Sequence, residues 1–291
     1  MSDVIENLCG ATVQHGPSSD RVYLMKIRDA DPVELIQKIE DLAAERGYSK
    51  IFTKVPAHSA QSFLDAGYAC EARVPLFFRG KEDALFLCRY LNKRRANMDD
   101  IEVLEQVMEL AMTKKGFGLR HAMPEDAVIR SCREDAVIRS CREDDVGAMA
   151  DIYKQVFPSY PFPVHDPAYL LETMRSHVLY FGVERKGRLL ALSSAELDCD
   201  GQNAEMTDFA TLPGSLGCGF AANLLAAMEP EAACHGIRTA YTIARAVSAG
   251  MNITFARLGY EFGGRLVNNT QISGTIESMN VWHKQLKPRE D

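Results

Sequence analysis

The chain lacks a long apolar run, a signal-like N-terminus and any closely spaced pair of cysteines. No apolar stretch in its 291 residues approaches the roughly 20 residues that a membrane helix needs, and no basic segment followed by an apolar run opens it. We therefore expect a soluble, cytoplasmic protein without a membrane partner. The eight cysteines form no C-x-x-C pair, which argues against a structural zinc site, and we expect no metal.

Positive charge is also scarce. Asp and Glu (40) outnumber Lys and Arg (33), and the net charge is −7. Nucleic-acid binding depends on clustered basic residues, and the one compact basic run, residues 93–95, is typical of a helix end. We therefore expect no nucleic-acid partner, whereas an acidic chain suits a small cationic substrate.

Length and composition indicate a globular protein with more than one domain. Apolar residues make up 46% and charged residues 25%, which excludes a fibrous or wholly disordered chain. A chain of this length favours two domains. We predict an N-terminal α/β domain over residues 1–118, which ends in an amphipathic connecting helix within 99–115. A linker follows at 119–136, and a catalytic domain spans 137–291.

A perfect tandem repeat lies at the predicted boundary. Residues 125–133 read EDAVIRSCR, and residues 134–142 repeat them without a change. Only the second copy leads directly into a predicted helix with an apolar stripe at helical spacing. We therefore predict a strand over 137–141, and we expect one of the two copies to be poorly ordered.

The two halves of the chain share a short pattern. A predicted strand at 50–55 precedes a helix and the sequence F-L-D-A-G-Y, and a predicted strand at 239–244 precedes a helix and F-A-R-L-G-Y. Strand, helix, glycine and strand often follow one another, so coincidence is one interpretation. The other is that the N-terminal domain is a degenerate half-copy of the catalytic one, without its own phosphate loop.

A glycine-rich loop carries the strongest chemical signal. The predicted strand 204–211 is followed by PGSLGCGFA at 213–221 and then by a helix with one apolar face. Free amides and the dipole at a helix start attract anions, and Gly217 and Gly219 would let a diphosphate approach the backbone. The spacing fits neither a P-loop nor G-x-G-x-x-G. A glycine helix cap without a ligand is the alternative.

The order of these elements and the loop at 216–221 resemble the GNAT superfamily of N-acetyltransferases, whose phosphate loop reads Gln/Arg-x-x-Gly-x-Gly/Ala. Leu216 departs from that pattern. Asn252 and the run F-A-R-L-G-Y from Phe255 resemble a later Asn…Tyr-x-x-x-Gly-Phe signature, with Phe255 in place of the tyrosine often assigned as general acid. The resemblance implies an α/β fold with a mixed, mostly antiparallel sheet flanked by helices. It also implies acetyl-CoA as co-substrate, bound by Phe209, Ala210, Thr211, Leu212, Leu216, Gly217, Cys218, Gly219, Phe220, Ala221, Asn252 and Phe255.

Three longer stretches, at 67–80, 206–214 and 251–284, are similar to the β-lysine N-acetyltransferases. This resemblance implies acetyl transfer to the N6 amine of β-lysine (3,6-diaminohexanoate), which gives the osmolyte N6-acetyl-β-lysine. Two alternatives stay open: a GNAT enzyme for another amine (a polyamine, an aminoglycoside or a protein lysine), or a non-catalytic acyl-CoA-binding regulator. The sequence is compatible with a homodimer but does not decide the oligomeric state.

Acetyl transfer needs an amine that has lost its proton. The carboxylates Glu205 and Asp208 on the predicted strand are the candidate catalytic bases, although they would point to opposite faces of an unbroken strand. A bulge would change that. Glu196 on the preceding strand, and Asn269 and Glu277 in the last hairpin, are candidates for binding the substrate. A solvated surface group is the alternative for each carboxylate.

Overall fold

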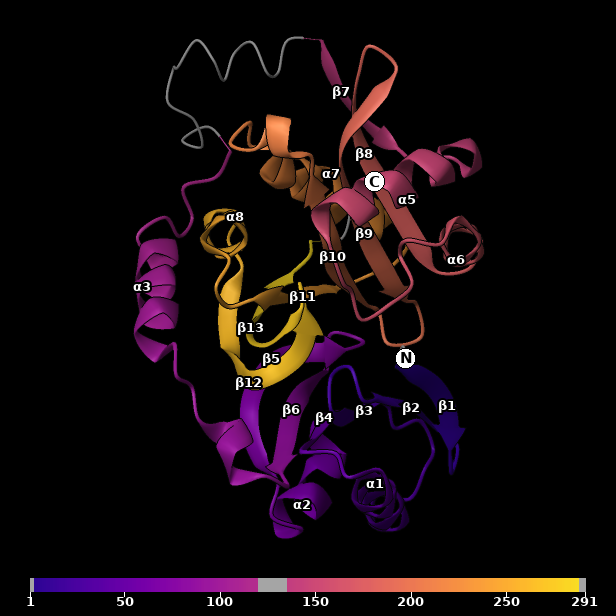
Figure 1. The fold of residues 1–291 in the computed structure, drawn as a ribbon, viewed down its shortest axis with the longest axis vertical. Helices are drawn as coiled ribbons and strands as arrows, with labels where there is room; N and C mark the ends of the chain where they lie inside the picture. Colours follow the sequence, from indigo (N-terminus) through magenta and orange to yellow (C-terminus); the bar gives the residue numbers. More distant parts are fainter. Residues whose placement is uncertain (1–2, 120–134, 288–291) are drawn as a thin grey trace.

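The computed structural model describes residues 3–119 and 135–287, and their strands form a single 13-stranded sheet (Figure 1). The sheet order is β1-β2-β3-β4-β6-β5-β12-β13-β11-β10-β9-β8-β7. No helix in these two ranges is long and apolar enough to cross a membrane.

The N-terminal half supplies one end of the sheet. Its elements are β1 (Val4–Leu8), β2 (Ala11–Gly16), β3 (Arg21–Lys26), α1 (Pro32–Arg46), β4 (Lys50–Pro56), α2 (Ala57–Asp65), β5 (Ala69–Phe78), β6 (Glu82–Tyr90) and α3 (Ile101–Met112).

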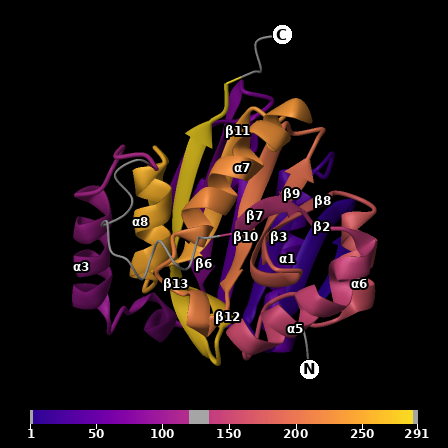
Figure 2. The same ribbon diagram turned by 90° about the horizontal axis from the view of Figure 1, so that it is seen from above.

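The C-terminal half supplies the rest. Its elements are β7 (Ala136–Ser140), α5 (Val146–Val156), α6 (Pro167–Met174), β8 (Val178–Arg185), β9 (Arg188–Asp198), β10 (Asn203–Thr211), α7 (Phe220–Cys234), β11 (Thr239–Arg245), α8 (Ala249–Arg257), β12 (Glu261–Ile272) and β13 (Thr275–Gln285). Helices α7 and α8 lie over one face of the sheet, as Figure 2 shows.

The two halves have the same topology. In each, a helix connects two parallel strands, β3 to β4 through α1 and β10 to β11 through α7. In each, a second helix then leads into an antiparallel hairpin, β5–β6 or β12–β13, whose second strand pairs with the strand before that helix. All other strand pairs are antiparallel. The expected mixed, mostly antiparallel α/β fold is confirmed, and the shared topology favours the half-copy interpretation over coincidence.

The connection from β3 to α1 explains why the N-terminal half has no phosphate loop. It reads Ile-Arg-Asp-Ala-Asp and contains no glycine. The side chain of Asp31 accepts hydrogen bonds from the amides of Val33 and Glu34, and Pro32 occupies the first helical turn. A carboxylate thus occupies the position at the helix start where an anion would otherwise bind.

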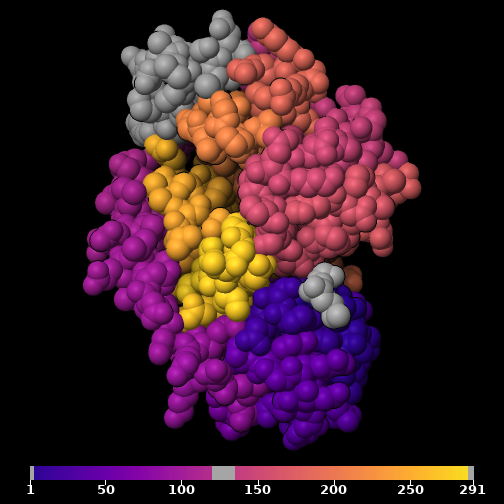
Figure 3. All heavy atoms as spheres, viewed as in Figure 1, coloured from indigo at the N-terminus to yellow at the C-terminus, as the bar shows by residue number. Residues whose placement is uncertain are grey.

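The halves are joined along β5 and β12. A Cβ on Gly264 would lie 2.2 Å from the carbonyl oxygen of Glu71, so only glycine allows the two strands to come this close. The buried Lys50 amine donates to the Glu71 carboxylate at 2.8 Å and to the Val267 carbonyl at 2.7 Å. In the space-filling view the yellow β12–β13 hairpin lies between the N-terminal half and the rest of the C-terminal half (Figure 3).

The predicted elements around the boundary agree with the structure where it describes them. The strand expected at 137–141 is the edge strand β7, which pairs with β8, and the expected connecting helix is α3. The segment that follows α3 is tied to α8, because the amides of Gly116 and Gly118 donate to the carbonyls of Ala256 and Arg257. The first repeat copy, 125–133, lies outside the described residues, so the expectation that one copy is poorly ordered stays a prediction.

Candidate active site

A cavity of about 750 Å³ lies where strands β10 and β11 separate. The two strands pair only over three positions, from Asn203↔Thr239 to Glu205↔Tyr241. Beyond Glu205 they diverge, and the cavity occupies the space between them. The backbone edges that face this gap are not paired with each other there, so a chain with amide groups can bind between the strands. Residues from both halves of the protein line the cavity.

The glycine-rich loop forms one end of the cavity. The amides of Gly217, Gly219, Phe220 and Ala221 donate to no acceptor within the described residues. Gly217 and Gly219 have φ angles of 78° and 71°, and a Cβ on Gly217 would meet no heavy atom within 4 Å. The loop is therefore open, and the positive end of the 15-residue helix α7 adds to its affinity for an anion.

A β-bulge brings the candidate carboxylates to this cavity. The register of β10 against β9 shifts between Thr207 and Ala210, and Asp208 has a φ of 54° at that point. The alternation of an unbroken strand is therefore lost. As a result Glu205 and Asp208 both line the cavity, together with Glu196.

Glu196 and Glu205 stand directly opposite each other on β9 and β10. Two like charges in such a pair are destabilising. Burial raises the pKa of Glu196 well above its usual value, and repulsion from Glu205 and Asp208 raises it further. Burial also raises the pKa of Glu205, against the opposing effects of the Lys54 ammonium and the Tyr241 hydroxyl. Carboxyls with raised pKa values are suited to exchanging protons with an amine.

Asp208 is in a different environment. The hydroxyls of Tyr160 and Ser194 each donate to one of its carboxylate oxygens at 2.5 Å. Burial raises the pKa of Asp208, and these two hydrogen bonds oppose that rise. Because both oxygens already accept a hydrogen bond, Asp208 is held in place and holds the Tyr160 ring at the cavity wall.

The N-terminal half contributes cavity residues that the sequence analysis missed. Lys54 donates to the Tyr241 hydroxyl at 2.9 Å and lies over the rings of Tyr241 and Phe77. Arg21, Tyr23 and Phe52 also line the cavity. Lys54 lies in the strand predicted at 50–55, but exposed strand residues are often charged as well, so its charge does not mark a site. We predicted no strand around Arg21 and Tyr23 from the sequence. Whether these residues reach the cavity depends on the arrangement of the whole sheet, and a local sequence pattern does not predict that arrangement.

Several predicted residues do line the cavity. They are Phe209, Thr211, Leu216, Gly217, Gly219, Phe220 and Ala221 from the set assigned to acetyl-CoA, and Glu196, Glu205, Asp208 and Asn269 from the catalytic and substrate sets.

Other predicted residues do not reach it. Asn252 is fully buried: its Oδ1 accepts from Asn280 and Trp282, and its Nδ2 donates to backbone carbonyls. Phe255 is also fully buried and packs edge-on against Phe209. Neither side chain lines the cavity, and their assignment to acetyl-CoA stays a prediction. The side chains of Ala210, Leu212 and Cys218 are likewise buried in the core.

Glu277, which we predicted to bind the substrate, pairs with an arginine. Its carboxylate forms two hydrogen bonds with Arg245, at 2.6 and 2.8 Å. It is Arg245 that lines the cavity, whereas Glu277 does not. Glu277 therefore orients that arginine, and its assignment to substrate binding stays a prediction.

Sequence comparison shows which known proteins this chain resembles. Residues 148–260 match the model of the acetyltransferase (GNAT) family. A β-lysine N(6)-acetyltransferase from Methanococcus maripaludis is 35% identical over 284 residues, which cover 98% of this chain and 99% of that protein. N-acetyltransferase YodP from Bacillus subtilis is 30% identical over 95% of this chain and 96% of its own length. A β-lysine N(6)-acetyltransferase from Methanosarcina mazei is 46% identical over 142 residues, about half of each chain.

Proposed function

Because this chain belongs to the acetyltransferase (GNAT) family, we propose that it transfers the acetyl group of acetyl-CoA to the N6 amine of β-lysine. The observation that carries this proposal is the cavity between β10 and β11, with open amides at one end and paired carboxylates on its wall. The relatives from Methanococcus and Methanosarcina, which are β-lysine N(6)-acetyltransferases, support the choice of acceptor.

The residues of the loop fit coenzyme A. Four open backbone amides at the start of α7 suit a diphosphate, and the unpaired edges of β10 and β11 suit the amide-bearing pantetheine arm. Leu216, which stands where the family has Gln or Arg, is 67% exposed, so the loop binds through its backbone. When bound, acetyl-CoA supplies an acetyl group activated as a thioester, and transfer to the amine leaves the free thiol of CoA.

The carboxylate pair prepares the amine. We assign the role of proton acceptor to Glu205, because its two flanking groups, Lys54 and Tyr241, hold it at the point where the strands part. Glu196 lies directly opposite and shares the positive charge of the incoming ammonium. Asp208 positions Tyr160 through its hydrogen bond and does not take the proton.

The test is to offer the protein a panel of amine acceptors and to measure release of the CoA thiol with each. We expect turnover with β-lysine to exceed that with polyamines, aminoglycosides and peptide lysines, and mass spectrometry with NMR to place the acetyl group on N6. Activity confined to peptide lysines or polyamines would contradict the acceptor assignment. CoA binding by calorimetry, without turnover of any amine, would favour a regulator instead of an enzyme.

A further inference from the structure

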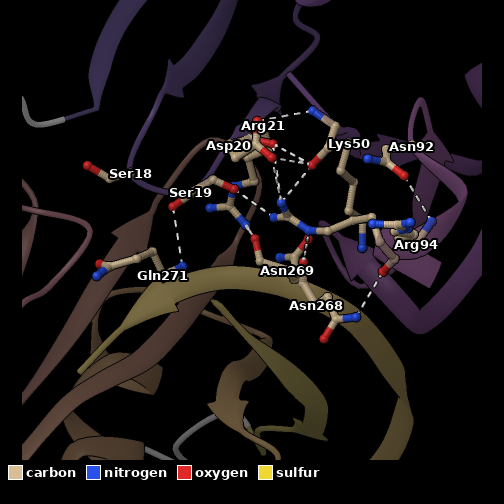
Figure 4. Close-up of polar contacts among 12 residues, drawn as sticks. Ser18, Ser19, Asp20, Arg21, Lys50, Asn92, Arg94, Asn268, Asn269 and Gln271 are labelled. Carbon is tan, nitrogen blue, oxygen red and sulfur yellow. Dashed lines mark hydrogen bonds and ion pairs between the residues drawn. The ribbon is translucent and has the colours of Figure 1, made fainter. Parts of the chain in front are cut away.

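Arg21 is a buried cation on the wall of the active-site cavity. Its side chain comes from β3 of the N-terminal half, and the residue is 4% exposed. One guanidinium nitrogen, Nη1, donates to the Asn269 carbonyl at 2.6 Å (Figure 4). The same nitrogen donates to the Thr270 hydroxyl at 3.0 Å. The guanidinium also lies over the rings of Tyr23 and Phe52, at 5.1 and 5.5 Å from their centroids. These contacts hold it in one orientation.

No carboxylate of residues 3–119 or 135–287 lies within ion-pair distance of Arg21. Other buried cations of this region are paired: Lys50 with Glu71 and Arg95 with Asp20. Burial lowers the pKa of Arg21 to about 10, with Asp3 giving some support at longer range. The guanidinium therefore stays charged at neutral pH, and a buried charge without a counter-ion strongly destabilises a protein. An anion that binds in the cavity would remove that penalty.

The atoms around the cavity point to a polar ligand as well. Buried polar atoms are almost always hydrogen-bonded in proteins. Within the described ranges, Gln14 Oε1, Arg21 Nε, Asn203 Nδ2 and Asn269 Oδ1 are buried and have no partner, and all four residues line this cavity.

Charge is distributed unevenly over the cavity wall. Glu196, Glu205 and Asp208 lie on β9 and β10, whereas Arg21 lies on β3. A diamino acid carries both kinds of group, since its ammonium groups suit the carboxylates and its carboxylate suits the arginine. A polyamine has no anionic group and would leave the buried arginine unpaired. The arrangement thus separates two classes of acceptor that both contain primary amines.

We infer that Arg21 binds the carboxylate of the acceptor and selects diamino acids over diamines, so that the N-terminal half-copy completes the substrate site. This inference rests on the proposed acetyl transfer and specifies how its acceptor is recognised. Arg21 and the glutamates come from different halves of the chain, and the β5–β12 junction that unites the sheet brings them to one cavity.

The test compares two matched pairs of acceptors in wild type and Arg21→Gln. 1,4-Diaminopentane is β-lysine without its carboxylate, and 1,5-diaminopentane is lysine without its carboxylate. We expect wild type to favour the acid of each pair. Arg21→Gln should raise KM for the acid about 10–100-fold, because the substrate carboxylate loses its charge-assisted hydrogen bonds. For the diamine, kcat/KM should stay the same or rise. Arg21→Lys should give a KM for the acid between those of wild type and Arg21→Gln.

Arg95→Gln is the matched control. Arg95 is a buried arginine at the same junction, but it pairs with Asp20 and does not line the cavity. Its replacement should lower the melting temperature without changing the ratio of kcat/KM between acid and diamine. The same result for Arg21→Gln, with equal losses on both acceptors, would assign Arg21 a structural role and overturn the inference.

The proposed function and this inference can fail separately. If wild type does not acetylate β-lysine but prefers lysine to 1,5-diaminopentane, and this preference depends on Arg21, the acceptor assignment fails and the inference stands. If wild type acetylates β-lysine and 1,4-diaminopentane equally well, the inference fails and the proposed function stands. Turnover of none of the four amines would overturn both.

Discussion

Replacing Gly217 by alanine tests the loop on which acetyl-CoA binding depends. Gly217 has a φ of 78°, a left-handed conformation that costs a residue with a Cβ about 1–2 kcal/mol. The added Cβ would meet no heavy atom within 4 Å, so no clash adds to this cost. For a chain of this size we expect the melting temperature to fall by about 2–6 °C.

The effect on acetyl-CoA should be larger than the effect on stability. The new methyl group would occupy the open space in front of the loop, and the diphosphate would lose one hydrogen bond to a backbone amide. Such a bond to a charged group is worth about 1.5–3 kcal/mol, which corresponds to a rise in KM for acetyl-CoA of about 10–100-fold. The measurement is thiol release over a titration of acetyl-CoA, with calorimetry of CoA binding.

Gly214→Ala is the control for this variant. Gly214 lies in the short 3-10 turn Pro213–Ser215, has no positive φ, and also leaves open space for a Cβ. It does not line the cavity, so its KM for acetyl-CoA and its melting temperature should match those of wild type. If Gly217→Ala melts lower as expected but keeps the wild-type KM, the diphosphate binds elsewhere and the reasoning is refuted.

Three further substitutions test the acidic wall of the cavity. Glu205→Gln should lower kcat about 10²–10⁴-fold, with KM for acetyl-CoA unchanged in the thiol-release assay. Lys54→Met removes a cation that lowers the pKa of Glu205, so the acidic limb of the kcat/KM profile should move to higher pH. Glu196 holds its proton more tightly in the folded than in the unfolded state, because its pKa is raised. Its contribution to stability is therefore complete below the unfolded pKa and is lost as the pH rises through the folded pKa. Glu196→Gln should accordingly gain about 1 kcal/mol over wild type at pH 8 and little at pH 4, as thermal melts would show.

Each of these outcomes has a clear opposite. A Glu205→Gln enzyme with nearly wild-type kcat would assign the proton to another acceptor. An acidic limb that does not move in Lys54→Met would mean that Glu205 is not the titrating group. A Glu196→Gln protein that melts below wild type at pH 8 would show that the carboxylate makes a favourable contact and is not strained by its neighbours.

The sequence was informative where the chemistry is local. The glycine-rich loop at 217–219 and the helix that follows it involve only a few consecutive residues, so this strand–loop–helix unit could be predicted. The structure shows that the loop amides are open. The same holds for the boundaries of β10 and α3, which follow from apolar periodicity. By contrast, Asn252 and Phe255 were assigned by a motif, and a motif does not show that a side chain points into the core.

The composition of the acidic wall depended on a detail that periodicity cannot supply. In an unbroken strand Glu205 and Asp208 would face opposite sides, and only the bulge at Asp208 directs both toward one cavity. The pairing of Glu196 with Glu205 is a matter of register between two strands, and register is set by the packing of the whole sheet.

By itself, the sequence determined the class of fold, the loop at the start of α7 and the family resemblance, because each depends on residues that lie close together along the chain. Only the tertiary structure decided that the N-terminal half takes part in the site. Arg21 and Lys54 line the same cavity as the glutamates of β9 and β10, because the sheet passes from β3 to β10 by way of the β5–β12 junction. The hydrogen bond from Lys54 to the Tyr241 hydroxyl joins residues 187 positions apart, and a glycine at 264 lets two strands from separate halves lie side by side.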